Sequence, residues 1–139
     1  MGKLLIPTCL YKMITETLKK MELINVIPVL KWTAKKSVYG YIRVDKTINK
    51  ETKTTTKKEY TIYINKNIIP QRFKDMDGRI NDITELIDTI CHELAHMDIE
   101  SHGVNHEKLT KLYKYAFYTE IGAENIINIL EKNCLWYEG

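Results

Sequence analysis

The chain has 139 residues, of which 44% are apolar and 28% are charged, and its formal net charge is +3. This composition is ordinary for a globular protein and excludes an intrinsically disordered chain. A chain of this length buries roughly two-thirds of its unfolded surface, so it can hold a hydrophobic core without metal or disulfides. We therefore expect a single domain over residues 1–139.

The cysteines and the N-terminal segment bear on the compartment. Cys9, Cys91 and Cys134 are odd in number and have no Cys-x-x-Cys spacing. This pattern argues against a disulfide framework and for a reducing compartment. Pro7 follows the first residues closely and no long apolar run is present, so we expect neither a signal peptide nor a membrane span. The expectation is a cytoplasmic protein.

The first half of the chain predicts one helix and a hairpin. Apolar residues recur at helical spacing over residues 8–21, where Thr8 can cap the helix. Trp32 follows Pro28 in a short extended or turn segment. Alternating β-branched and aromatic residues predict strands over 38–44 and 60–65. Between these strands, the polar stretch from Asp45 to Lys58 is expected to form a long hairpin tip.

The second half predicts three helices. A connection through Pro70 and a turn at 75–78 lead into a helix over 82–99, with Asp82 and Glu85 as a capping pair. Further amphipathic helices are predicted over 105–119 and 123–132, separated by Gly122. The apolar residues expected to face the core from the first of these two are Leu109, Leu112, Tyr113, Ala116 and Phe117. Leu135, Trp136 and Tyr137 are expected to pack back on the body. The fold class is therefore α+β, with a small antiparallel sheet or hairpin packed against helices.

The helix over 82–99 contains His92-Glu93-Leu94-Ala95-His96. On a helical wheel, an apolar stripe built from Ile83, Leu86, Ile87, Ile90, Leu94 and Met97 occupies one face. His92 and His96 fall on the opposite face, one turn apart, so both imidazoles can reach one metal ion. Glu93 flanks the pair and can contact a water on the metal. The motif predicts a catalytic zinc site.

A hydrolytic zinc site usually has three protein ligands, and two later histidines are candidates for the third. On a continuing straight helix, His102 would lie about 15 Å beyond His92, which is too far for coordination. A turn near 101–103, at Gly103, is therefore a necessary part of the hypothesis. His106 is the alternative third ligand. In the other interpretation, His106 lies beside the ligands and does not coordinate the metal.

The same residues resemble the SprT-like zinc metallopeptidases over roughly residues 25–118. The matching segments are Leu30-Lys31-Trp32, Tyr39-Gly40-Tyr41, Ile62-Tyr63-Ile64-Asn65, the run from Thr89 to His96, and His102-Gly103 opening a new helix. The resemblance implies a zincin-like domain, one catalytic Zn²⁺ and His102 as the third ligand. The sequence departs from the family at His106, where members generally carry an aromatic residue.

If zinc is held by His92, His96 and His102, it lowers the pKa of a bound water toward 7. Glu93 is then expected to take the water proton and deliver it to the leaving amine. Residues 60–65 are the expected sheet edge for pairing with an extended or unfolded polypeptide substrate. Asp88, one turn before His92, either orients that ring or lies in solvent.

Charge is uneven along the chain. Residues 31–58 carry nine Lys or Arg against Asp45 and Glu51, a net of +7, which leaves −4 for the rest. One interpretation is contact with DNA phosphates, as several SprT-like proteases make; the other is a solvated hairpin whose lysines discourage aggregation. The alternatives to an enzyme are a metal-stapled module that binds nucleic acid through 31–58, and an adaptor without metal. Glu93 favours catalysis, because a purely structural metal site has no use for that carboxylate.

Overall fold

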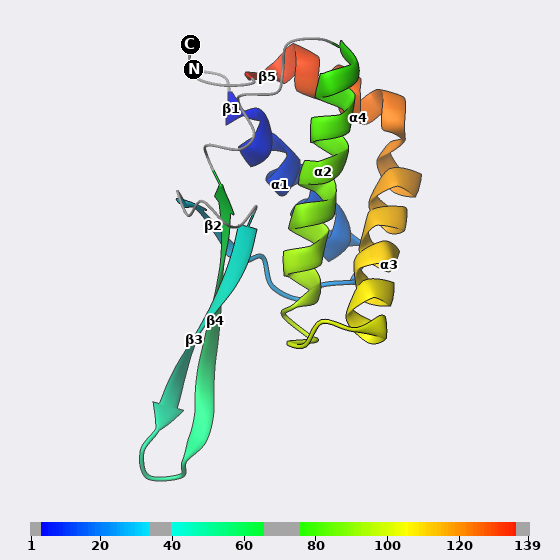
Figure 1. Cartoon of the computed structure of the whole chain (residues 1–139). Helices are drawn as coiled ribbons and strands as arrows, with labels where there is room; N and C mark the ends of the chain where they lie inside the picture. The colour runs from blue at the N-terminus through cyan, green and yellow to red at the C-terminus, as the bar shows by residue number, and fades with distance from the viewer. Residues whose placement is uncertain (1–3, 34–39, 66–75, 136–139) are drawn as a thin grey trace.

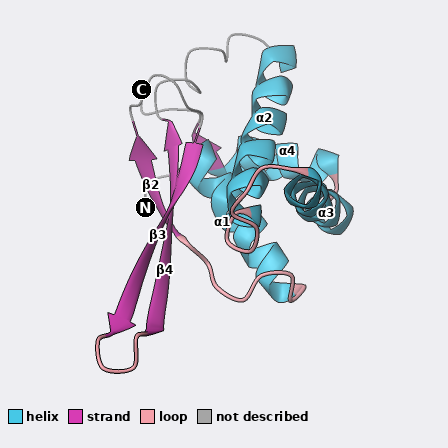
Figure 2. Cartoon of the chain, turned by 60° about the horizontal axis from the view of Figure 1, so that its bottom comes forward, coloured by secondary structure: helices cyan, strands magenta, loops and turns pink. Residues whose placement is uncertain are grey.

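The computed structural model describes residues 4–33, 40–65 and 76–135. The helices are α1 (Ile6–Lys20), α2 (Met76–Ala95), α3 (Val104–Ile121) and α4 (Ala123–Asn133). The strands are β1 (Leu4–Leu5), β2 (Val29–Thr33), β3 (Gly40–Asn49), β4 (Thr54–Asn65) and β5 (Cys134–Leu135). The α+β class is confirmed, and the three longer strands lie together on one side of the helices (Figures 1 and 2).

The main sheet has the strand order β2-β4-β3. β3 and β4 form the predicted antiparallel hairpin, and β2 adds a parallel strand on the other side of β4. The short strands β1 and β5 pair in parallel separately. The sheet is therefore mixed, because Val29–Thr33, expected only as an extended or turn segment, joins it as a strand.

The hairpin is longer than predicted and extends beyond the helices (Figure 1). The residues expected in a loop continue both strands, and only 50–53 make the turn. Asn49 supports this turn, since its side-chain oxygen accepts hydrogen bonds from the backbone N–H of Glu51 and Thr52 at 2.9 and 3.3 Å. The threonines and isoleucine near the tip favour extended backbone, which the polar composition concealed.

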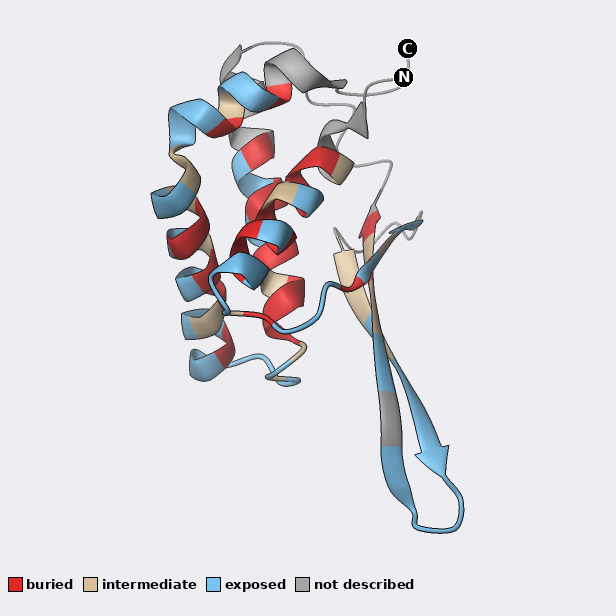
Figure 3. Ribbon diagram, turned by 180° about the vertical axis from the view of Figure 1, so that it is seen from behind, coloured by how far each residue is buried: buried red, intermediate tan, exposed pale blue. Residues whose placement is uncertain are grey.

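The core lies between the helices and the inner face of the sheet (Figure 3). Ile62 and Ile64 of β4 are fully buried there. The stripe predicted for α2 is confirmed: Ile83, Leu86, Ile87, Ile90 and Leu94 are buried, and Met97 packs against the cluster. Burying each such side chain contributes roughly 1.5–3 kcal/mol, so this stripe fixes which face of α2 is left for chemistry.

Two helix starts differ from the prediction. α1 begins at Ile6, so Thr8 lies inside its first turn and is not the cap. α2 begins at Met76, so Gly78 and Asp82 lie within the helix instead of in a turn and at a cap. Both helices continue past the residues predicted to cap them, so the local capping patterns did not set the helix starts. Pro70, Asp75, Trp136 and Tyr137 lie outside the described residues, as do residues 38–39 of the first predicted strand.

Of the residues predicted to face the core from α3, Tyr113, Ala116 and Phe117 are buried and Leu109 packs against the core, so the prediction is wrong only at Leu112. Leu112 is 48% exposed, whereas the polar residues His106 and Thr110 are buried with Tyr113, Ala116 and Phe117. Thr110 satisfies its hydroxyl locally, by donating to the backbone oxygen of His106 at 2.9 Å. The first turns of α3 therefore face α2 with polar side chains, which a hydrophobic pattern alone does not reveal.

Among the cysteines whose side chains are described, Cys91 is free and fully buried. Cys9 is disulfide-bonded, whereas the cysteine pattern argued against a disulfide framework. Cysteine spacing does not report which thiols a fold brings together. None of the described helices has the length and hydropathy needed to cross a bilayer.

Close contact between β3 and α2 depends on Gly40. A Cβ at this position would lie 2.8 Å from the backbone oxygen of Tyr63 and 3.0 Å from Cγ2 of Thr89. Gly40→Ala is therefore expected to lower the free energy of unfolding by about 1–3 kcal/mol, measured by urea denaturation. Gly103→Ala is the matched control, because a Cβ there meets nothing within 4 Å. A loss at Gly40 no larger than at Gly103 would contradict this packing.

Candidate metal centre

The C-terminal end of α2 carries the first two histidines and the glutamate. His92 and Glu93 belong to its last turns, and His96 follows Ala95 in a tighter turn, where its N–H donates to the backbone oxygen of Glu93 at 3.1 Å. The apolar stripe holds the opposite face of α2 in the core. The two imidazoles are thereby presented on the side predicted from the sequence.

The required reversal of the chain is present. The motif helix ends at Ala95 instead of near 99, and α3 begins at Val104. The segment between them returns His102 to the end of α2. Gly103 precedes α3 with φ 165°, an extended conformation. The turn predicted near 101–103 is therefore confirmed.

Three imidazole nitrogens converge at one point. The Nε2 atoms of His92, His96 and His102 are 3.2 Å apart in all three pairs. Two nitrogens bonded tetrahedrally to zinc at 2.0–2.1 Å would be separated by about 3.3 Å. The triangle thus has the size that one zinc ion requires, and three neutral imidazoles are a known catalytic donor set.

The protonation of the cluster also suits a metal. The Nδ1 of His96 donates to the backbone oxygen of Ile99 at 2.9 Å, because a carbonyl can only accept. Its Nε2 is left with a free lone pair. Burial, followed by the other histidines, lowers the pKa of His92 to about 4, and burial lowers the pKa of His96 as well. Both rings are therefore neutral at pH 7, as metal ligands must be.

His106 is a fourth imidazole in the cluster. Ligand-type atoms of His92, His96 and His106 lie within 4.8 Å of one another, so these three histidines also group as a possible metal site. The Nε2 of His106, however, donates to the backbone oxygen of His92 at 2.9 Å. Its ring stacks on that of His96, with centroids 3.9 Å apart and planes 20° apart. The tighter Nε2 triangle therefore includes His102 and not His106.

Glu93 is the carboxylate beside the cluster. It is 5% exposed, and its Oε1 lies 3.7 Å from the Nε2 of His92. Burial raises the pKa of Glu93 to about 7, near the value that suits a general base at neutral pH. A metal dication alongside would favour the ionised form. Glu93 is thus placed to exchange a proton with a water at the histidines.

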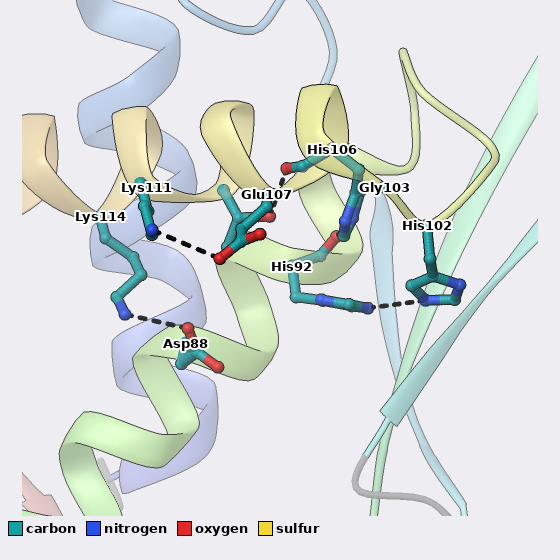
Figure 4. Close-up of a pocket in the computed structure, with 9 residues that line it drawn as sticks. Asp88, His92, His102, Gly103, His106, Glu107, Lys111 and Lys114 are labelled. Carbon is teal, nitrogen blue, oxygen red and sulfur yellow. Dashed lines mark hydrogen bonds and ion pairs between the residues drawn. The ribbon is translucent and has the colours of Figure 1, made fainter.

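Two hollows open on the cluster. One, of about 530 Å³, lies against β3 and is lined by Gly40, Tyr41, Ile42, Val44, His92, Glu93, His96, Glu100 and His102. The other, of about 390 Å³, lies between α2 and α3, and His92 and His102 line it too (Figure 4). His92 and His102 therefore lie between the two hollows, where a bound polypeptide can pass from one hollow into the other.

The strand bordering the first hollow corrects one expectation. Residues 60–65 belong to β4, which is the central strand: residues 61–64 pair with both β2 and β3. Their edge is not free for a substrate. β3 is the outer strand on this side, and Gly40 lets it approach α2. The sequence located the hairpin but not which of its strands is outermost.

Among the described residues, Asp88 forms no hydrogen bond or ion pair with His92, although its charge opposes the lowering of the pKa of that ring. Its Oδ1 accepts from the Nζ of Lys114 at 2.9 Å, and its side chain is 54% exposed (Figure 4). The interpretation of Asp88 as a surface residue is the closer one. The ion pair between Asp88 and Lys114 joins α2 to α3, and both residues line the second hollow.

Comparison with models of protein families, with characterised proteins and with solved structures found no match for this chain.

Proposed function

We propose that the protein is a zinc-dependent endopeptidase that cleaves extended or unfolded polypeptide. The observation that supports this most is the equal 3.2 Å spacing of the Nε2 atoms of His92, His96 and His102 beside a buried Glu93. A metal-binding module would need the imidazoles only. The buried carboxylate facing the first hollow is the feature that favours an enzyme.

In this proposal His92, His96 and His102 hold the metal through Nε2. His106 stays outside the ligand set, because its Nε2 proton is engaged by the backbone oxygen of His92. Zinc held by the three rings supplies Lewis-acid chemistry: it makes water more acidic and polarises a carbonyl oxygen. Resemblance to the SprT-like metallopeptidases agrees with this ligand set.

Glu93 performs the proton transfers. It accepts a proton from the attacking water and delivers it to the nitrogen of the departing amine, so that the carboxyl returns to its starting form. Its low exposure keeps the carboxylate poorly hydrated and basic. The ring of His92 is 3.7 Å from Oε1, which keeps the acid beside the metal ligands without making it one of them.

β3 aligns the substrate. Its outer edge is unpaired within the described sheet and borders the hollow that contains Glu93 and the histidines. An extended peptide can add to such an edge through backbone hydrogen bonds, which are tolerant of sequence. In a folded protein most backbone N–H and C=O groups are already paired, so an unfolded polypeptide adds to this edge more readily.

The proposal is tested by incubating the purified protein with casein, with and without a chelator. We expect cleavage into peptides that a chelator abolishes and added Zn²⁺ restores. Binding of one zinc ion with no cleavage of any unfolded substrate would support the metal-stapled module instead. Contact of residues 31–58 with DNA stays a prediction. It is tested by repeating the cleavage assay with DNA present. Lys35 and Lys36 of this segment lie outside the described residues.

A further inference from the structure

The outer part of the hairpin, residues 45–59, forms an arm that extends beyond the helices (Figure 1). The arm continues β3 outward from Val44, the last residue of β3 that lines the first hollow. The last rung before the arm is Val44 opposite Tyr60. Val44 lines the hollow, and the Tyr60 hydroxyl donates to the backbone oxygen of Met97 at 3.5 Å, on the same side. This rung therefore marks which side of the hairpin faces the metal centre.

Side chains alternate between the two sides of a hairpin, so the next rungs can be assigned. Asp45 is opposite Glu59 and faces away from the centre. Lys46 is opposite Lys58, and this rung returns to the side of Val44 and Tyr60. The arm thus places two acids on its outer side and two lysines on the side that continues the hollow.

The lysine rung is electrostatically unfavourable by itself. Directly opposed residues have Cβ atoms about 4.5–5.5 Å apart, and like charges there destabilise the pair. On the outer side, Asp45 is offset by Arg43 at 3.2 Å. Within the part of the chain that the structure describes, Lys46 and Lys58 have no carboxylate partner. An anion from another molecule would remove this repulsion.

We propose that Lys46 and Lys58 bind an acidic segment of an extended polypeptide substrate, a few residues from the bond to be cleaved. This rests on the proposed peptidase function. A strand added to the edge of β3 rises about 3.3 Å per residue, so the lysine rung lies about 7 Å beyond Val44. A peptide that pairs with β3 at the hollow reaches the lysines without bending.

The charge distribution favours a peptide over a nucleic acid. A peptide strand along β3 presents alternate side chains to one side of the arm, and one or two carboxylates there meet both lysines. On the outer side Asp45 is paired with Arg43, whereas the opposed lysines Lys46 and Lys58 lie on the side of the hollow. The opposed lysines are therefore matched to a ligand that lies on one side of the arm.

The test measures binding of two unstructured peptides to zinc-loaded Glu93→Gln protein. The peptides are identical except that one has three glutamates where the other has glutamines. The double substitution Lys46→Gln and Lys58→Gln is compared with Lys50→Gln and Lys53→Gln at the turn, which removes the same charge. We expect about a threefold to tenfold loss for the acidic peptide in the first variant, and less than a twofold change in the turn variant or for the glutamine peptide.

Lys46→Glu separates recognition from folding of the arm. It restores opposite charges across the rung, so the melting temperature is expected to stay the same or rise while affinity for the acidic peptide falls. Equal losses in the rung and turn variants would overturn the proposal. So would no preference for the acidic peptide, or displacement of that peptide by a DNA duplex whose affinity depends on the same rung. Casein cleavage scores the peptidase function separately, because peptide binding to the Glu93→Gln protein requires no turnover.

Discussion

Glu93→Gln is expected to reduce peptide cleavage by about 10²- to 10⁴-fold and to leave zinc binding unchanged. Glutamine has nearly the same shape but cannot accept the proton of the attacking water. Because Glu93 is not one of the three imidazoles, the metal should remain at one ion per chain. The measurement is the rate of casein cleavage, with zinc content determined on the same preparation.

Glu124→Gln is the matched control for that substitution. Glu124 is an exposed carboxylate in the first turn of α4, away from both hollows. It should retain the wild-type rate. If Glu93→Gln cleaves casein as fast as Glu124→Gln, Glu93 takes no part in the chemistry and the proton-transfer role is lost.

The two later histidines are expected to respond differently to substitution. His102→Ala removes a ligand and should weaken zinc binding by more than about 100-fold. His106→Gln retains an amide N–H for the backbone oxygen of His92 and should cost about tenfold or less, since loss of an outer partner typically costs 10- to 100-fold. Competition with a chromogenic chelator measures both affinities.

His106→Phe extends this comparison. Phenylalanine keeps a ring against His96 but has no N–H for the oxygen of His92, which is 2.9 Å away in the wild type. Its affinity for zinc should fall between those of wild type and His102→Ala. If substitution of His106 weakens zinc binding more than substitution of His102, His106 is the third ligand and the assignment made here is wrong.

The sequence alone predicts the part of the site that depends on helical periodicity. The stripe from Ile83 to Leu94 fixes the buried face of α2, and His92 and His96 follow on the other face because four residues make about one turn. The distance argument for His102 also held, since a rise of 1.5 Å per residue required a reversal that the chain makes before Val104.

What the sequence does not predict depends on contacts between distant segments. Strand order is one such property. β4 is central because β2 pairs with it on the side away from β3, and no local sequence pattern indicates this pairing. The hydrogen bond from His106 to the backbone of α2 is another. A glycine at position 40, in a strand otherwise rich in large residues, was the available signal of close approach to α2.

The charge asymmetry of residues 31–58 shows the same limit. The net charge is as counted, but the strand register places its members on different sides: Lys46 and Lys58 share one side of the hairpin, whereas Arg43 and Asp45 lie on the other. A count along the chain treats these charges as one lobe. Pairing between strands decides which of them a bound molecule would meet.

The central claim is that three imidazoles bind one metal ion through Nε2, and anomalous diffraction at the zinc edge from zinc-loaded crystals tests it most directly. The account predicts one anomalous peak per chain, about 2.0–2.1 Å from the Nε2 atoms of His92, His96 and His102, with His106 still bonded to the backbone of His92. A peak ligated by His106 in place of His102, or no peak at the end of α2, would contradict it.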